Sequence, residues 1–203
     1  MVDTHSFLDD PGGTREEIMR ATYLALCEHG YAGLTVERIG EEFPKSKSLI
    51  YHHYDGKDDL LLDFLEFLLE HFEAGMPPDG DAGPRDHLES ILDHVLAAPL
   101  PERRQEFLRA MVELRAQAAH DPAYRDQFGR HDRFLIDLLA TVIERGIEEG
   151  VFREVDPDEV AGMLVAMVHG AMAARVTTSD DPVSTIRAGV DDYVLERLLV
   201  SDR

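Results

Sequence analysis

Lysine is almost missing from this 203-residue chain: three lysines occur, and arginine supplies every other basic charge counted. Cysteine occurs once, at Cys27, which excludes an internal disulfide and indicates a reducing compartment. No apolar run comes near the roughly 20 residues that cross a bilayer. The first ten residues are mostly polar and acidic, unlike a signal peptide. We therefore expect a cytoplasmic protein that has no membrane partner.

Positive charge is also scarce relative to negative charge. The chain has 41 acidic and 20 basic residues, a net charge of -21 and a pI near 4.7. Such a surface repels DNA, and even residues 1–60 carry 12 acidic against 6 basic side chains. Dense carboxylates with little lysine resemble proteins from a salt-saturated cytoplasm, where acidic side chains keep the surface hydrated. This composition predicts a halophilic source.

Apolar residues recur at helical spacing through the whole chain. They make up 44% of it, enough to bury one large core or two smaller ones. Three Asp-Pro pairs mark helix starts, because aspartate caps an N-terminus and proline suits the first turn. The pattern predicts an all-α fold of about nine helices, near residues 15–29, 35–43, 46–53, 57 to the Pro- and Gly-rich loop 76–84, 85–98, 102–119, 122–149, 157–176 and 182–200.

Two of these helices are short and closely spaced. Thr35 is expected to cap the first, and Pro44 must end it because proline cannot continue the hydrogen-bond ladder. Short helices at 35–43 and 46–53, joined by a tight turn, are typical of a helix-turn-helix, whose second helix enters the major groove of DNA.

The three lysines lie in this region. Lys45, Lys47 and Lys57 fall within thirteen residues that also hold hydroxyls, aromatic rings and imidazoles. This mixture suits phosphates and base edges. The alternative is a chance grouping of three lysines on a solvated face.

A family resemblance follows from these residues. Residues 15–69 resemble the DNA-binding domain of the TetR/AcrR repressors, through Gly30-Tyr31, Leu34-Thr35-Val36, the run from Ser46 to Tyr54, and Lys57-Asp58-Asp59-Leu60-Leu61. Residues 113–122 and 145–152 are similar, more loosely, to the ligand-binding and dimerisation domain of one branch. The resemblance implies a flexible segment at 1–14, a three-helix DNA-binding domain at 15–56, and a ligand-binding and dimerisation domain at 57–203 that opens with a long helix.

The resemblance also implies which side chains contact DNA. Phosphate contacts correspond to Thr35, Tyr51 and Lys57, and base contacts to Lys47, Ser48, Leu49 and His52. Three further residues of the same stretch are predicted to contact DNA: Ser46, Lys45 and His53. Lys45 would be an added phosphate contact, and His53 would either contact a phosphate or cap the helix.

Two neighbouring features are interpreted differently. Tyr54 is expected to pack against the first helix rather than to contact DNA. The turn Phe43-Pro44-Lys45 departs from the glycine-containing turn of the family. Because proline forbids the positive φ that glycine allows, the turn must follow another backbone path or open by one residue.

The last two helices carry more apolar residues than packing within one chain needs. The family pairs these helices across a dimer, which would hold two reading helices roughly 34–36 Å apart on a palindromic operator. The alternative is a monomer that buries the apolar stripes internally. The expected interface residues are Val160, Leu164, Val168, Ile186, Val190, Val194 and Leu198.

A ligand is expected to control DNA binding. In the family, a bound effector shifts the long helix that starts at Lys57 and so changes the spacing of the reading helices, a shift that requires different affinities for two states. Methionines among the expected lining residues would adapt to a small, largely apolar molecule. These residues are Phe64, Phe67, Phe107, Met111, Phe134, Leu138, Met163 and Met167.

Enzymatic alternatives find little support. A di-metal oxidase needs Glu-x-x-His, and a hydrolase of the common type needs Gly-x-Ser-x-Gly; neither occurs. His87 and His94 share a helix face but are expected to be solvated. We therefore predict no catalytic residue, metal or cofactor. The sequence predicts a DNA-binding regulator; it leaves repression and activation both open, and the resemblance favours a ligand-released repressor. The alternative is a helical signalling or structural dimer without specific DNA binding.

Overall fold

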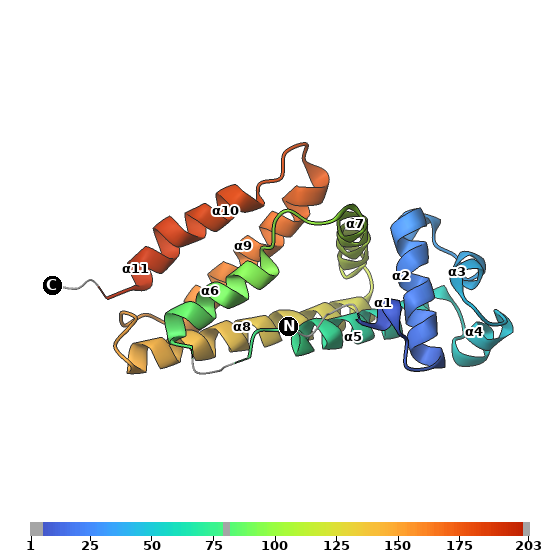
Figure 1. Ribbon diagram of the computed structural model, residues 1–203, viewed down its shortest axis with the longest axis horizontal. Helices are drawn as coiled ribbons and strands as arrows, with labels where there is room; N and C mark the ends of the chain where they lie inside the picture. The colour runs from blue at the N-terminus through green and yellow to red at the C-terminus, as the bar shows by residue number, and fades with distance from the viewer. Residues whose placement is uncertain (1–5, 79–81, 201–203) are drawn as a thin grey trace. The chain divides into compact units, whose positions relative to one another are not determined.

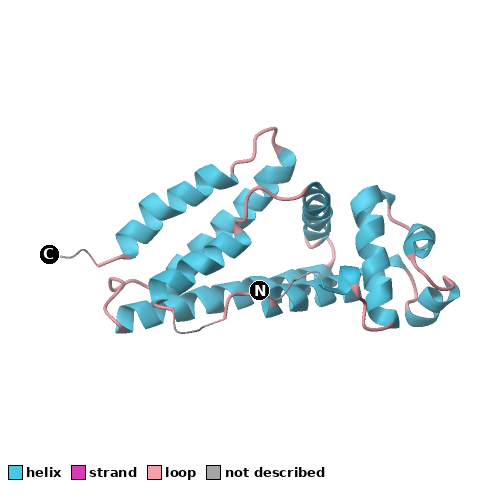
Figure 2. Ribbon diagram, in the orientation of Figure 1, coloured by secondary structure: helices cyan, strands magenta, loops and turns pink. Residues whose placement is uncertain are grey.

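The computed structural model describes residues 6–78 and 82–200, and within them all side chains except those of Ser6, Phe7, Arg103, Tyr193 and Val194. In these ranges the regular structure is helical, apart from one antiparallel bridge between Phe152 and Leu199 (Figure 2). The all-α prediction is confirmed. The bridge falls in the short link after residue 149.

The chain divides into two compact units, Met1–Gly75 with Pro101–Gly129, and Met76–Leu100 with Arg130–Arg203. Helices of the first unit are α1 (Ser6–Asp9), α2 (Thr14–Gly33), α3 (Val36–Glu42), α4 (Ser48–His53), α5 (Lys57–Ala74), α7 (Glu102–Gln117) and the start of α8 (Pro122–Glu148) (Figure 1). The second unit holds α6 (Pro84–Val95), the rest of α8, α9 (Pro157–Thr177), α10 (Val183–Val190), the π-helical η1 (Asp191–Leu195) and α11 (Glu196–Leu198).

The core of the first unit is built mainly from α2 and α5. Ile18 and Leu26 of α2, Ile39 of α3, Ile50 of α4 and Leu61 of α5 are each at most 1% exposed and belong to one cluster. Short helices such as α3 and α4 are unstable alone, so this shared burial holds them in place. Ile39 and Ile50 therefore anchor the two short helices in the head, the name used below for residues 14–57.

Helix starts follow the expected local chemistry. Thr35 Oγ1 accepts a hydrogen bond from Arg38 N–H at 3.3 Å at the start of α3. At each Asp-Pro pair the aspartate carboxylate accepts a hydrogen bond from a backbone N–H two or three residues later: Asp121 at 2.8 Å, Asp156 at 3.1 Å and Asp181 at 3.0 Å. These caps satisfy N–H groups that a helix leaves unpaired.

Helix α2 contains a break that the sequence places at Gly30. Gly30 has φ of 64°, the left-handed region that favours glycine, yet the helix resumes and runs to Gly33. The sequence thus predicts the position of the break but not the extra turn. A carboxylate from α7 closes this break: Glu113 Oε2 accepts a hydrogen bond from Tyr31 N–H at 2.8 Å.

The N-terminal segment is partly ordered. Arg20 Nε donates to the carbonyl oxygen of Leu8 at 2.6 Å, and Leu8 packs against the core of the first unit. Residues 6–9 form the short helix α1, and the predicted flexibility of segment 1–14 stays a prediction. Residues 1–5 lie outside the described part of the chain.

Two expectations about polarity are also corrected. His87 is 3% exposed, and its Nε2 lies 3.1 Å from the Pro77 carbonyl oxygen, so it is a buried, hydrogen-bonded side chain rather than a solvated one. Helix α9 is long and apolar enough, by length and composition, to cross a membrane, with a mean hydropathy of 1.5, whereas no such stretch was predicted. Only 28% of its most apolar window is buried within the chain.

Candidate nucleic-acid interface

Helix α4 presents a polar face opposite one buried residue. Ile50 is fully buried, whereas Lys47, Ser48 and His52 are exposed and Tyr51 is 51% exposed. Successive residues of a helix point about 100° apart, so burial of Ile50 turns its neighbours toward solvent. The structure thus brings together at the α4 end of the head the residues that the sequence predicts to read bases, with Leu49 half-buried beside them.

The start of α4 is fixed by hydroxyls. Ser46 Oγ lies 2.8 Å from Ser48 Oγ and accepts a longer hydrogen bond from Ser48 N–H at 3.4 Å. The Ser46 carbonyl accepts from Leu49 N–H at 2.9 Å. Helix α4 begins at Ser48 rather than at the predicted Ser46, because residues 46 and 47 form the turn that enters it.

The turn between α3 and α4 occupies residues 43–47. Phe43 is 5% exposed and extended, with φ of -86° and ψ of 124°, and no residue of this turn is among those in the left-handed region, which in the described residues are Gly30 and Gly150. The close approach that shapes this turn involves Gly40 instead. A Cβ at Gly40 would lie 2.9 Å from Lys47 Cβ, closer than packed carbon atoms allow. Gly40 therefore lets the stem of Lys47 cross α3, a role that the sequence analysis missed.

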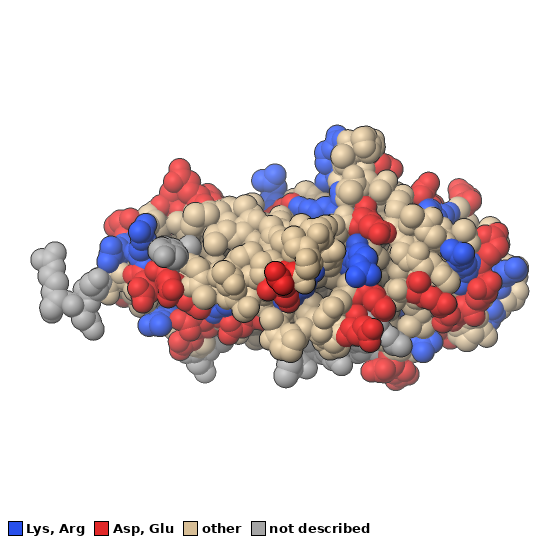
Figure 3. Space-filling model, turned by 90° about the horizontal axis from the view of Figure 1, so that it is seen from above, with Lys and Arg blue, Asp and Glu red and all other residues tan. Residues whose placement is uncertain are grey.

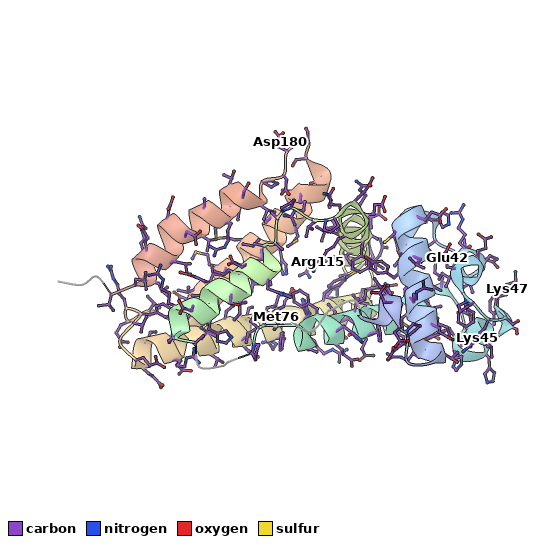
Figure 4. The ribbon with its side chains drawn as sticks, viewed as in Figure 1. Glu42, Lys45, Lys47, Met76, Arg115 and Asp180 are labelled. Carbon is purple, nitrogen blue, oxygen red and sulfur yellow. The ribbon has the colours of Figure 1, made fainter. Side chains whose placement is uncertain are left out.

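Lys45 points to the start of α2. Its ammonium forms an ion pair with Glu17 and lies 3.1 Å from Thr14 Oγ1. Figure 4 labels Lys45 and Lys47 at the α3–α4 end of the head. Lys45 as a phosphate contact stays a prediction, and such a contact would have to compete with Glu17.

A second carboxylate lies beside the reading helix. The Tyr51 hydroxyl donates to Glu37 Oε1 at 3.0 Å, which raises the pKa of Tyr51. The pKa of Glu37 is lowered by a hydrogen bond from its own backbone N–H and by those from Tyr51 and Thr35. Since a carboxylate repels phosphate, the Tyr51 hydroxyl must exchange Glu37 for a phosphate oxygen if it contacts DNA.

The remaining predicted contacts lie at helix ends. Lys57 opens α5, and its Nζ lies 4.5 Å from the centroid of the Tyr31 ring, a cation–π contact. His53 ends α4 and is exposed, with its ring 6.3 Å from that of Tyr54. Tyr54 is half-buried against the core and its hydroxyl donates to Asp63, in keeping with a packing role.

No broad basic surface accompanies these residues on the face shown in Figure 3, where acidic and basic side chains are intermingled over the described residues. Attraction to DNA must then come from a few well-placed cations. Electrostatic steering by the whole molecule is opposed by its net charge of -21.

The predicted effector residues divide between the two units. In the first unit, Phe64 and Phe67 are buried, and the Phe107 ring stacks on Tyr23 at 4.5 Å and meets Phe64 edge-on at 6.4 Å. Met111 packs against the same core. In the second unit, Phe134, Leu138 and Met167 are half-buried, while Met163 is 46% exposed.

The predicted dimer residues are mostly buried within the chain. Four of them, Leu164, Val168, Val190 and Leu198, are at most 7% exposed. These four are buried inside the second unit, where α10 packs against α9 and η1, and α11 packs against η1. Val160 and Ile186 remain half-exposed, and the side chain of Val194 lies outside the described residues.

Comparison with known proteins identifies the same two regions. Residues 18–64 match the model of bacterial regulatory proteins of the tetR family, and residues 84–199 match that of the C-terminal domain of BetI-type transcriptional repressors. The repressor AcnR of Corynebacterium diphtheriae is 28% identical over 91% of this chain and 87% of its own length.

Solved structures agree with these matches. A TetR transcription regulator from Haloarcula marismortui is 37% identical, with a TM-score of 0.85, over 92% of this chain and 98% of that one. A transcriptional regulator from Saccharomonospora viridis, solved in complex with choline, shares the fold at 22% identity and a TM-score of 0.77, over 92% of this chain and 98% of that one.

Proposed function

Because this chain belongs to the TetR family of DNA-binding transcriptional repressors, we propose that it binds a palindromic operator as a homodimer in the cytoplasm and is released by a small ligand. The repressor is a DNA-binding protein and not an enzyme. The alternative of a helical dimer that has lost DNA binding is not favoured.

The observation that carries this proposal is the exposed face of α4. Ile50 is anchored in the core, and Lys47, Ser48 and His52 are exposed at the surface of the head. An ammonium group can donate to guanine O6 and N7, and a hydroxyl or imidazole can donate to or accept from several base edges. These three side chains would therefore set sequence preference.

Phosphate contacts would flank this face. Thr35 Oγ1 accepts the capping hydrogen bond from Arg38 N–H and donates its own hydroxyl hydrogen to Glu37, so Thr35, like Tyr51, would have to exchange Glu37 for a phosphate oxygen. Tyr51 is exposed and Lys57 lies at the N-terminal end of α5, where the helix dipole favours an anion. Together they would fix the register of α4 on the duplex.

The dimer would use a different face of α9 from the one predicted. Met163, Ala166 and Gly170 are exposed and recur at three- and four-residue spacing, so they share one face. A Cβ at Gly170 would meet no atom within 4 Å. Small side chains allow close approach of a second helix, and a partner would cover the apolar surface that gives α9 its membrane-like hydropathy.

The proposed effector is a small organic molecule, because the residues predicted to line its site are apolar. Half-buried side chains such as Phe134, Leu138 and Met167 in the second unit leave apolar surface for it. The Saccharomonospora viridis regulator shows that a protein of this fold holds a small organic ligand. Release from DNA then requires that the ligand bind one state of the dimer more tightly than the other.

The proposal is tested in two steps. Selection of DNA from a random duplex library with the purified chain should enrich an inverted repeat, and fluorescence anisotropy should then show saturable binding to it. Lys47→Ala should weaken that binding by about tenfold, the loss expected for one base contact. Arg133→Ala, which removes an exposed cation from α8, is the matched control and should leave affinity unchanged. Failure to enrich any sequence would contradict the proposal.

A further inference from the structure

A pocket in the first unit shares no lining residue with the predicted effector site. It encloses about 400 Å³ and is lined by Tyr31, Asp58, Gln117, His120, Asp121, Pro122 and Tyr124. These residues come from the kink of α2, the start of α5 and the junction of α7 with α8. Its volume lies within the range of small-molecule sites.

One side chain of this pocket has an unmet hydrogen-bonding group. Tyr124 is 1% exposed, and its hydroxyl oxygen is buried without a hydrogen-bond partner among the described residues. A buried polar group without a partner is destabilising unless something satisfies it. The pKa of Tyr124 is raised by burial and by Tyr31, Asp58 and Asp121, which indicates that these groups lie close enough to interact.

The charge of the pocket selects the class of ligand. Asp58 and Asp121 are its two carboxylates, which favour a cationic ligand. The ammonium of Lys57 lies over the ring of the lining residue Tyr31 at 4.5 Å, so one positive charge stands beside the pocket and the two carboxylates exceed it.

We propose that this pocket binds the ammonium group of a small primary amine. A primary ammonium has three N–H donors, and the pocket offers two carboxylates and the unpartnered Tyr124 hydroxyl oxygen as acceptors. The apolar tail would lie against the aromatic rings and Pro122. This site goes beyond the proposed repressor function and does not depend on DNA binding.

Binding is measured by isothermal titration calorimetry of the full chain without DNA, at constant ionic strength set with KCl. The probe is n-butylammonium chloride, and its isomer tetramethylammonium has the same charge without N–H donors. We expect saturable binding of one n-butylammonium per chain, and an affinity for tetramethylammonium weaker by about tenfold or more, the loss expected for charge-assisted hydrogen bonds.

Variants locate the site. Asp121→Asn keeps an oxygen that can cap α8, and with Asp58→Asn it should weaken n-butylammonium binding by about tenfold. Asp126→Asn, an equal charge change on the exposed side of α8, should have no effect. Tyr124→Phe removes only the hydroxyl, so it should weaken binding without lowering the melting temperature, and it tests the site even if an aspartate variant folds poorly. The proposal is overturned by absence of saturable heat, by equal binding of the two isomers, or by unchanged binding in Tyr124→Phe.

Discussion

Glu113 Oε2 accepts a hydrogen bond from the backbone N–H of Tyr31 at 2.8 Å, and so joins α7 to the kink of α2. The bond occurs where Gly30, with φ of 64°, interrupts the helical ladder and leaves an N–H without its usual carbonyl. A carboxylate is a stronger acceptor for this N–H group than the neutral carbonyl oxygen that it replaces. The geometry of the DNA-reading head therefore depends on a side chain from a helix 82 residues away.

Glu113→Ala should destabilise the protein by about 1–3 kcal/mol, because it leaves the partly buried Tyr31 N–H without an acceptor. Glu113→Gln keeps a neutral acceptor and should lose less. Urea unfolding followed by circular dichroism measures both. Glu144→Ala, which changes an exposed glutamate near the C-terminal end of α8, is the control for lost charge and helix propensity. Equal stabilities of the Glu113 and Glu144 variants would mean that the bond to Tyr31 contributes nothing.

Local chemistry made much of the fold predictable. Thr35 and the Asp-Pro pairs act within a few residues of themselves, so their spacing in the sequence already fixes which N–H groups they satisfy. The break at Gly30 and the exposed face of α4 follow from glycine chemistry and helical periodicity in the same way.

Contacts between distant segments were not predictable. Periodicity marked Leu164 and Val190 as apolar but did not tell whether a neighbour in the same chain or a partner covers them; the structure buries both within the chain. Lys45 lies in a stretch rich in DNA-binding chemistry, yet its ion pair with Glu17 forms through the tertiary placement of α2. Side-chain partners of this kind depend on how helices pack, which residue spacing alone does not specify.

Glu17→Gln should strengthen DNA binding. The change removes a carboxylate from the head and frees the Lys45 ammonium, so phosphate attraction should rise by a few-fold and the salt dependence should steepen. Fluorescence anisotropy on the selected operator measures this at several KCl concentrations. Glu28→Gln makes the same charge change at an exposed site of α2. A gain as large in Glu28→Gln would show that overall charge, and not release of Lys45, is responsible.

Asp63 should make stability depend on pH in the acid range. Burial raises its pKa, but hydrogen bonds from Arg15 and Tyr54 outweigh this and hold the pKa below its ordinary value. A lowered folded-state pKa contributes stability that is present above the unfolded pKa of about 3.9 and is lost as pH falls through the folded value. Asp63→Asn should therefore cost about 1–3 kcal/mol at pH 7, with a difference from wild type that shrinks below about pH 4.

Denaturant unfolding at several pH values measures that difference. Asp137→Asn, which changes an exposed aspartate of α8, supplies the control and should follow the wild-type pH profile. A stability difference between wild type and Asp63→Asn that stays constant from pH 7 to about pH 3 would contradict the assigned role.

Ala166→Glu should convert the proposed dimer into monomers. A carboxylate on the exposed face of α9 would be buried against its symmetry mate, and an unpaired buried charge is costly. Analytical ultracentrifugation gives the mass of each species in solution. Ala116→Glu places the same charge on an exposed position of α7 and should remain dimeric. A dimeric Ala166→Glu variant would place the interface elsewhere.

Specific DNA binding should persist in molar KCl, because few cations serve the proposed contacts. Lys45 is in an ion pair with Glu17, which leaves Lys47 and Lys57 as the lysines expected to contact phosphate or base without first breaking an ion pair in the described part of the head. Two heads then neutralise about four phosphates, which predicts a slope of log affinity against log salt of about -4. At about 1 M salt the Debye length is about 3 Å, so base contacts from α4 and shape fit must supply most of the affinity.

Anisotropy titrations from low to molar KCl give the slope, and circular dichroism at each salt concentration shows whether the chain stays folded. A much steeper slope, with specific binding abolished while the protein is folded, would mean that phosphate attraction dominates.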